Sequence, residues 1–162
     1  MDELIPANKV LPAMPEEGVA RAYAFEKALL AQEQIPVKTE HVLHAGLYAR
    51  TLYVPSGVLV AGVLIKIPTV LIVHGDTLFY TGDGFVRLTG YNVLQTPAGR
   101  KPALVTFTPT VFTMLFATQA KTVDEAEREF TDEFENLITR KAGGICQEQP
   151  QPQQYIRPPQ QW

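Results

Sequence analysis

The side chains that could bind a metal or exchange protons are few and poorly spaced for either chemistry. The chain contains three histidines, His41, His44 and His74. His41 and His44 lie in an alternating stretch that predicts a strand, where residues three apart point to opposite faces. These two imidazoles would therefore not bind one ion together. His74 stands beside Gly75 and Asp76, where we expect a turn and a hydrogen-bonding role for the ring.

The candidate nucleophiles also lack the neighbours that would activate them. Cys146 is the only cysteine, which excludes an internal disulfide and a cysteine cluster for zinc, and nothing beside it in the sequence indicates a lowered thiol pKa. Ser56 lies in a Pro-Ser-Gly turn rather than a G-x-S-x-G elbow. Asp83, between two glycines, is typical of a hairpin turn. The sequence therefore predicts no catalytic residue, no metal site and no cofactor.

Three cations in or near the strand-rich region are candidate ligand-binding residues: Arg50, Lys66 and Arg87. If their side chains point into a barrel, they would bind an anion such as a nucleotide or a sugar acid. The alternative is that they face outward and protect strand edges from pairing with other chains.

Composition narrows the class of protein. A chain of 162 residues with 46% hydrophobic residues is long enough for one domain with a sizeable core. A net charge of -3, with 14 Lys and Arg, gives no electrostatic case for nucleic-acid binding. No apolar run approaches the roughly 20 residues that span a bilayer, so we expect no membrane association. The first ten residues carry two acids and no apolar core, unlike a secretory signal, and a reducing cytoplasm is the simplest location.

Residues 46–118 organise the rest of the chain. They consist of short apolar or alternating runs rich in Val, Leu, Ile, Thr, Tyr and Phe, separated by turn residues. The spacing is too short for crossover helices, so neighbouring strands should be antiparallel. The predicted class is mainly β, an antiparallel barrel or sandwich with flanking N- and C-terminal helices. We expect strands at 37–45, 46–54, 58–67, 69–73, 76–80, 85–89, 91–96, 103–108 and 110–117.

Two helices should flank the strands and complete a domain over residues 15–141. The first runs from Pro15 to about residue 34, with proline and acids in its first turn and an apolar stripe through Ala22, Phe25 and Leu29. The second runs from 122 to 141 and begins with capping-box spacing between Thr122 and Glu125.

The two ends of the chain differ in composition from the domain. Residues 1–14 predict an extended arm, either loose or laid over a neighbouring subunit. Residues 142–162 form a Pro/Gln-rich tail whose composition is typical of disorder. The tail nevertheless carries aromatic and arginine side chains of the kind that anchor interfaces. We therefore expect it to contact another subunit or protein through Tyr155, Ile156, Arg157 and Trp162.

The order of turns resembles the cupin superfamily. Val54-Pro55-Ser56-Gly57, Val73-His74-Gly75-Asp76 and Thr96-Pro97-Ala98-Gly99 are similar to successive cupin turn motifs. The resemblance covers residues 40–118 and implies a cupin barrel. Cupin enzymes place two histidines and an acid on the strand after the first turn, whereas residues 58–66 here carry no such ligand. Arg100-Lys101-Pro102 stands where a further histidine usually follows, so the usual metal site is missing.

Two longer strings, HAGLYARTLYVPSG at 44–57 and AGRKPALVTFTPTVFTMLFATQAKTVDEAEREFTDE at 98–133, resemble small cupin-like proteins of tailed phages and prophages. That resemblance implies a non-enzymatic structural or interaction protein of the virion, made in the host cytoplasm. Its partners would be copies of itself and other virion proteins. One alternative is a phage protein that sequesters a small anionic ligand. The other is a metal-dependent cupin enzyme acting on a sugar or small acid.

Overall fold

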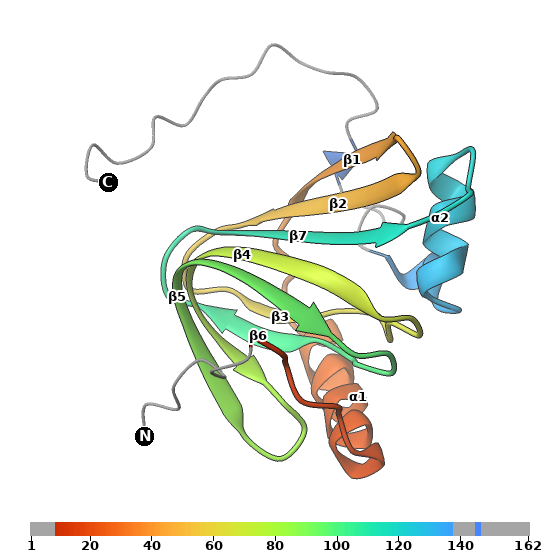
Figure 1. Cartoon of the computed structure of the whole chain (residues 1–162). Helices are drawn as coiled ribbons and strands as arrows, with labels where there is room; N and C mark the ends of the chain where they lie inside the picture. Colours follow the sequence, from red (N-terminus) through yellow and green to blue (C-terminus); the bar gives the residue numbers. More distant parts are fainter. Residues whose placement is uncertain (1–8, 138–144, 147–162) are drawn as a thin grey trace.

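The computed structural model describes residues 9–137 and the backbone of residues 145–146, which form one curved, mainly antiparallel sheet with helices beside it (Figure 1). The described strands follow the order β3-β6-β4-β7-β2-β1-β8, and β5 also pairs with β4. Only β1 and β8 pair in parallel among the described strands. The sheet curls into a half-barrel, which confirms the predicted fold class. The elements are α1 (Glu16–Leu30), β1 (Lys38–His44), β2 (Leu47–Val54), β3 (Leu59–Ala61), β4 (Thr69–Tyr80), β5 (Phe85–Thr96), β6 (Ala103–Thr106), β7 (Thr110–Ala117), α2 (Val123–Phe130), η1 (Phe134–Asn136) and β8 (Ile145–Cys146).

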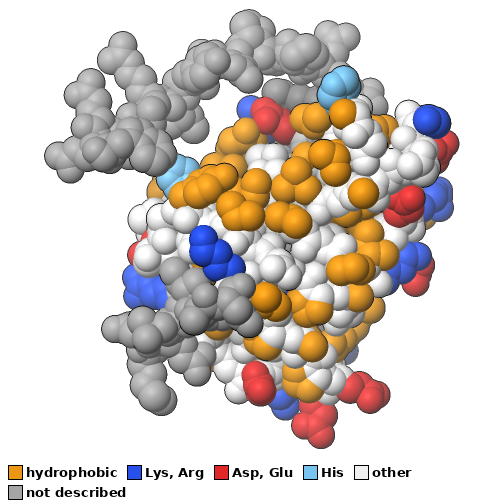
Figure 2. Space-filling model, viewed as in Figure 1, with side chains coloured by type: hydrophobic (Ala, Val, Ile, Leu, Met, Phe, Trp, Pro, Cys, Tyr) orange, Lys and Arg blue, Asp and Glu red, His pale blue; other side chains and the backbone are white. Residues whose placement is uncertain are grey.

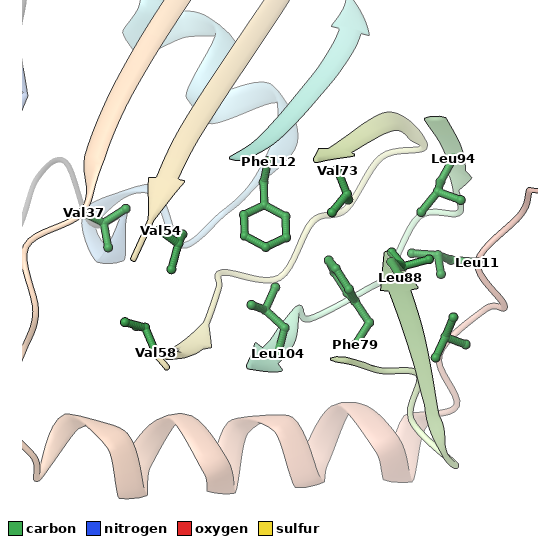
Figure 3. Close-up of a cluster of buried hydrophobic side chains, with 11 residues drawn as sticks. Leu11, Val37, Val54, Val58, Val73, Phe79, Leu88, Leu94, Leu104 and Phe112 are labelled. Carbon is green, nitrogen blue, oxygen red and sulfur yellow. The ribbon is translucent and has the colours of Figure 1, made fainter. Parts of the chain in front are cut away.

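The core lies on the concave face of the half-barrel. Strand alternation sends every second side chain inward, and Val73 of β4, Phe112 of β7 and Leu104 of β6 meet there (Figure 3). A second cluster around Tyr48, Phe116 and Phe130 packs α2 against the wall that β1, β2 and β7 form.

Strands β4 and β5 are longer than the sequence predicts. The expected turns at 74–76 and at Gly90 are wrong, because β4 and β5 run through them as one hairpin in which Gly75 pairs with Gly90. Both glycines have positive φ, +150° at Gly75 and +72° at Gly90, which lets the strands bend without losing their pairing. A Cβ at Gly75 would lie 2.3 Å from the Thr110 Oγ1 atom. Gly75 and Gly90, which would usually indicate turns, therefore form a bend inside a continuous hairpin.

The predicted strand at 58–67 is mostly absent. Only Leu59–Ala61 pairs as a strand, with β6, and that pairing stops where Gly62 meets Pro102, which has no N–H to donate. Beyond it, the Ile65 N–H donates to the Arg100 carbonyl and the Lys66 N–H to the Phe130 carbonyl, both at 2.8 Å. Residues 62–66 are therefore held by separate hydrogen bonds to different parts of the chain and not by continuous pairing with one strand.

The two helices are confirmed, with earlier ends than expected. α1 ends at Leu30, where the Gln34 side chain donates to the Leu29 carbonyl. α2 begins as predicted, with Thr122 Oγ1 accepting from the Glu125 N–H. It ends at Phe130 because Thr131 is extended and its hydroxyl accepts from the Glu133 N–H. The expected continuation through 137 is therefore wrong, and residues 138–141 lie outside the described residues.

Part of each terminal segment can be placed. Residues 9–14 lie along the chain's own barrel, where Leu11 is buried and its N–H donates to the Gln95 carbonyl at 2.9 Å. At the other end, Ile145–Cys146 pairs with Lys38–Thr39. The predicted partner-binding residues Tyr155, Ile156, Arg157 and Trp162 lie outside the described residues.

The convex face of the sheet carries an apolar patch. One cross-strand row consists of Val42, Ala49, Leu115 and Val70, on four adjacent strands. Val42 and Val70 are exposed. Figure 2 shows hydrophobic side chains gathered over this part of the molecule.

Within the described part of the chain, neither helix has the length and apolarity that a membrane crossing would require.

The bend at Gly75 can be tested by adding one methyl group. Gly75→Ala should lower the free energy of unfolding by about 2 to 4 kcal/mol, because it combines an unfavourable φ with overlap against Thr110. Gly57→Ala is the matched control, since Gly57 also has positive φ but a Cβ added there would have nothing within 4 Å, and it should cost about 1 kcal/mol. Urea unfolding measures both; equal losses would contradict the close approach.

Candidate functional site

A cavity of about 450 Å³, partly open to solvent, lies between the inner walls of the barrel. Strands β2, β4, β6 and β7 contribute apolar side chains, and α1 closes another side with Leu29 and Leu30. The strand residues that line it include Leu52, Leu71, Phe79, Leu104, Phe112 and Met114. A second hollow, of about 540 Å³, lies between α1 and the β4–β5 hairpin and is more open. It contains Arg21, which donates to the Tyr80 hydroxyl and the Gly82 carbonyl.

Arg50 brings a positive charge into the cavity wall. It lies in β2 between the inward-facing Tyr48 and Leu52, opposite Met114 of β7, and is only 5% exposed. Its Nη1 atom is 3.7 Å from Glu127 Oε1, and Glu127, on α2, is buried as well. This contact is an ion pair without a hydrogen bond, since 3.7 Å exceeds hydrogen-bonding distance. Among the described residues, Arg50 Nη1 has no hydrogen-bond partner.

Arg100 is the second guanidinium in the cavity wall. It follows β5, is 4% exposed, and donates to the Pro12 carbonyl and, at 3.3 Å, to the Tyr80 carbonyl. In the part of the chain that the structure describes, no carboxylate lies within ion-pair distance of it. Burial lowers the pKa of Arg100, because a charged group loses hydration inside the protein.

The other two predicted ligand-binding cations lie elsewhere. Lys66 is exposed and pairs with Asp132 at 2.7 Å. Arg87 lies on an exposed position of β5, where it forms a two-point contact with Asp76 at 2.8 and 2.9 Å and covers the Phe107 ring. The outward-facing alternative therefore describes Lys66 and Arg87, whereas Arg50 faces inward. Arg100 was missed because a residue that follows a Pro-Ala-Gly turn is typical of a solvated loop.

The histidines do not gather at the cavity. His41 is half-buried, with Nδ1 2.8 Å from the Tyr48 hydroxyl, while His44 is exposed. His74 is exposed in the middle of β4 beside Tyr91, so its predicted place in a turn is wrong. The described residues contain no group of three or more His, Cys, Asp or Glu placed to hold an ion. The two arginines of the wall have no lone pair to offer a metal, and its two carboxylates, Glu26 and Glu33, belong to no group of three such ligands among the described residues. The cavity therefore does not fit the metal that a cupin resemblance implies.

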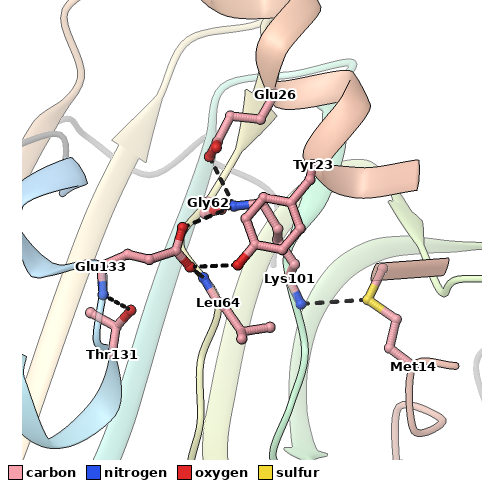
Figure 4. Close-up of polar contacts among 8 residues, drawn as sticks. All are labelled: Met14, Tyr23, Glu26, Gly62, Leu64, Lys101, Thr131 and Glu133. Carbon is pink, nitrogen blue, oxygen red and sulfur yellow. Dashed lines mark hydrogen bonds and ion pairs between the residues drawn. The ribbon is translucent and has the colours of Figure 1, made fainter. Parts of the chain in front are cut away.

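A buried lysine fixes α1 against the barrel beside the cavity (Figure 4). The Lys101 side chain is fully buried, and its Nζ atom donates to the Gly62 carbonyl and to Glu26 Oε2, both at 2.9 Å. Glu133 Oε1 is 3.6 Å away, and the Tyr23 ring lies 4.1 Å from the ammonium. Burial, followed by the hydrogen bond to Glu133, raises the pKa of Tyr23 to about 12. These contacts join α1 to the β3–β4 and β5–β6 connections and to the segment that follows α2.

Comparison with known proteins adds a likeness of fold. No protein-family model and no curated protein matches the chain. The similar solved structures include several cupin domains. A cupin domain from Bordetella pertussis Tohama I is 16% identical, with 54% of this chain and 98% of that chain covered and a TM-score of 0.43. A cupin superfamily protein from Desulfitobacterium hafniense DCB-2 is 16% identical, with 67% and 98% covered and a TM-score of 0.45. KdgF from a Halomonas species is 17% identical, with 59% and 90% covered and a TM-score of 0.45. Likenesses at this level assign no function to the chain.

The Lys101 contacts can be tested against a surface ion pair. Lys101→Met should lower the free energy of unfolding by about 3 kcal/mol, because Glu26 and Glu133 lose their shared cation in a largely buried place. Lys66→Met removes an exposed pair and should cost less than about 1 kcal/mol. Urea unfolding at neutral pH measures both. Similar losses for the two variants would show that Lys101 does not hold the helix.

Proposed function

We propose that the protein binds a small, mainly apolar organic molecule inside its cupin-like barrel, without catalysing a reaction on it. The observation that carries the proposal is the cavity itself. Protein interiors are close-packed and hold few voids larger than a water molecule, whereas ligand sites commonly enclose about 300–1,000 Å³. A cavity of about 450 Å³ lined mainly by Leu, Val, Ile and Phe falls in the second class.

The chemistry of the lining favours binding over catalysis. Its described residues include no histidine, cysteine, serine, lysine or tyrosine, so the cavity lining lacks the usual nucleophiles and most groups that transfer protons. Two carboxylates reach the lining: that of Glu26 is engaged by Lys101, and Glu33 lies at an exposed position. Thr69 and Thr96 share a hydrogen bond with each other. A ligand in this cavity would be held mainly by apolar contacts.

Filling part of the cavity should weaken binding. Leu71 lines the cavity from β4, and Leu71→Trp would occupy part of its volume. The probe is the neutral dye N-phenyl-1-naphthylamine, whose emission rises in an apolar site. We expect the unaltered protein to bind it and Leu71→Trp to bind about tenfold more weakly or worse. Thr89→Trp, at an exposed position of β5, should bind normally, and circular dichroism would verify folding. Equal binding by both variants would exclude the cavity as the site.

A second candidate function, assembly into an oligomer or a particle, is favoured by the apolar convex face. Soluble monomers rarely expose large contiguous apolar patches, and such patches commonly mark interaction sites. The row Val42, Ala49, Leu115 and Val70 crosses four strands of one face. The virion role implied by the phage resemblance stays a prediction, and mass spectrometry of purified virions tests it directly.

A charge on the convex face tests the assembly function. Val70→Lys places an ammonium in the row and should shift any oligomer towards monomer by about tenfold in dissociation constant. Thr89→Lys, on an exposed position of the neighbouring strand, is the matched control. Light scattering over a range of concentrations measures the mass. An unaltered protein that remains monomeric at high concentration would remove the support for self-assembly.

A further inference from the structure

The inner face of the wall made by β1 and β2 holds two buried polar atoms that the protein itself leaves unsatisfied. In the described part of the chain, Thr39 Oγ1 and Arg50 Nη1 are the buried side-chain atoms without a hydrogen-bond partner. Thr39 pairs with Leu52 and His41 with Arg50, so Thr39 and Arg50 are diagonal neighbours across the two strands. Buried donors are almost always satisfied, and an orphan needs an explanation. Of the two residues, Arg50 lines the cavity, so a molecule bound there can supply the partner that its Nη1 atom lacks.

The group that completes Arg50 has to be an acceptor. A guanidinium has N–H donors only, and the Glu127 oxygen 3.7 Å away is too distant to accept from Nη1. A carboxylate offers acceptor oxygens and a negative charge to the Arg50 N–H groups, and its planar geometry matches the guanidinium fork.

The charges around the cavity favour an anion over a neutral acceptor. Arg50 and Arg100 are both buried in the lining, and Glu127 is the carboxylate in ion-pair contact with either of them among the described residues. Glu26 and Glu133 are engaged by Lys101 and are each about one-fifth exposed. Glu33 also lines the cavity, at an exposed position, and Lys101 is shared by two carboxylates, so the shortage of negative charge is local to the two guanidiniums and does not extend to the cavity as a whole.

We propose that the ligand is a monocarboxylic acid with an apolar body, whose carboxylate binds Arg50 while its body lies along Leu52, Leu71 and Phe112. This assignment rests on the proposed binding function and adds its ligand class. The carboxylate would lie against the β1–β2 wall, and the apolar side chains of β4 and β7 would surround the remainder of the molecule. Arg100 adds positive charge to the same cavity, but it already donates to two backbone carbonyls, so the donor that lacks a partner is Arg50 Nη1.

The test compares two probes that share a chain and differ in one group, decanoate and decan-1-ol, by isothermal titration calorimetry on the full chain. The unaltered protein should bind decanoate about tenfold more tightly or better, since a hydrogen bond to a charged partner is stronger than a neutral one. Arg50→Met combined with Glu127→Gln removes the guanidinium without leaving a buried carboxylate. This variant should lose the preference for decanoate while binding decan-1-ol within about threefold of the unaltered protein.

Two further variants keep the test decisive. Arg50→Lys retains the charge without the planar fork and should weaken decanoate binding by about threefold or more while sparing decan-1-ol, even if the double variant does not fold. Arg87→Met, which removes a surface guanidinium, should change neither affinity. If the neutral dye binds but decanoate and decan-1-ol bind equally to the unaltered protein, the carboxylate assignment is wrong and the binding function stands. If no probe binds, both are wrong.

Discussion

The whole barrel depends on one bend in strand β4. Along one edge, β4 pairs with β7 through Val70–His74 and then with β6 through Thr77–Phe79, and the change of partner falls at Gly75. Along its other edge, β5 follows it throughout, with Gly90 opposite Gly75. A side chain at Gly75 would collide with Thr110, at the corner where the chain passes from β6 to β7. Because this backbone can approach so closely, one hairpin contributes to both walls, and the space between the walls becomes the cavity.

The cavity stays open because polar contacts, rather than apolar filling, hold its third side. α1 fully buries only Gly18 and Ala22. It is fastened by the Lys101 ammonium at one point and by Arg21, through the Tyr80 hydroxyl and the Gly82 carbonyl, at another. A helix held this way need not push large side chains into the barrel. The charged groups thus have two separate roles: Lys101 and Arg21 position the helix, while Arg50 and Arg100 line the cavity.

Strand alternation made the fold class and most inward-facing positions predictable from the sequence. The bend at Gly75 was misread because a glycine with positive φ looks the same in a turn and inside a long strand. The end of α2 was missed because Phe130, Phe134 and Leu137 keep helical spacing across the extended residue Thr131. Arg50 was identified as a candidate, but its direction depends on register. Nothing in the local sequence indicated that Arg100 and Lys101 would be buried, since their partners come from residues 12, 26 and 133.

The way α1 is fastened also bears on how the interior exchanges with solvent. Local openings of a native protein require least free energy where little apolar surface becomes exposed. By that criterion α1 should detach more readily than β4, whose backbone is paired along both edges. Because α1 forms one side of the cavity, its detachment would open a path to the interior while the sheet stays folded. Entry and departure of a bound molecule would then follow the rate of a subglobal unfolding event, and no permanent channel would be needed.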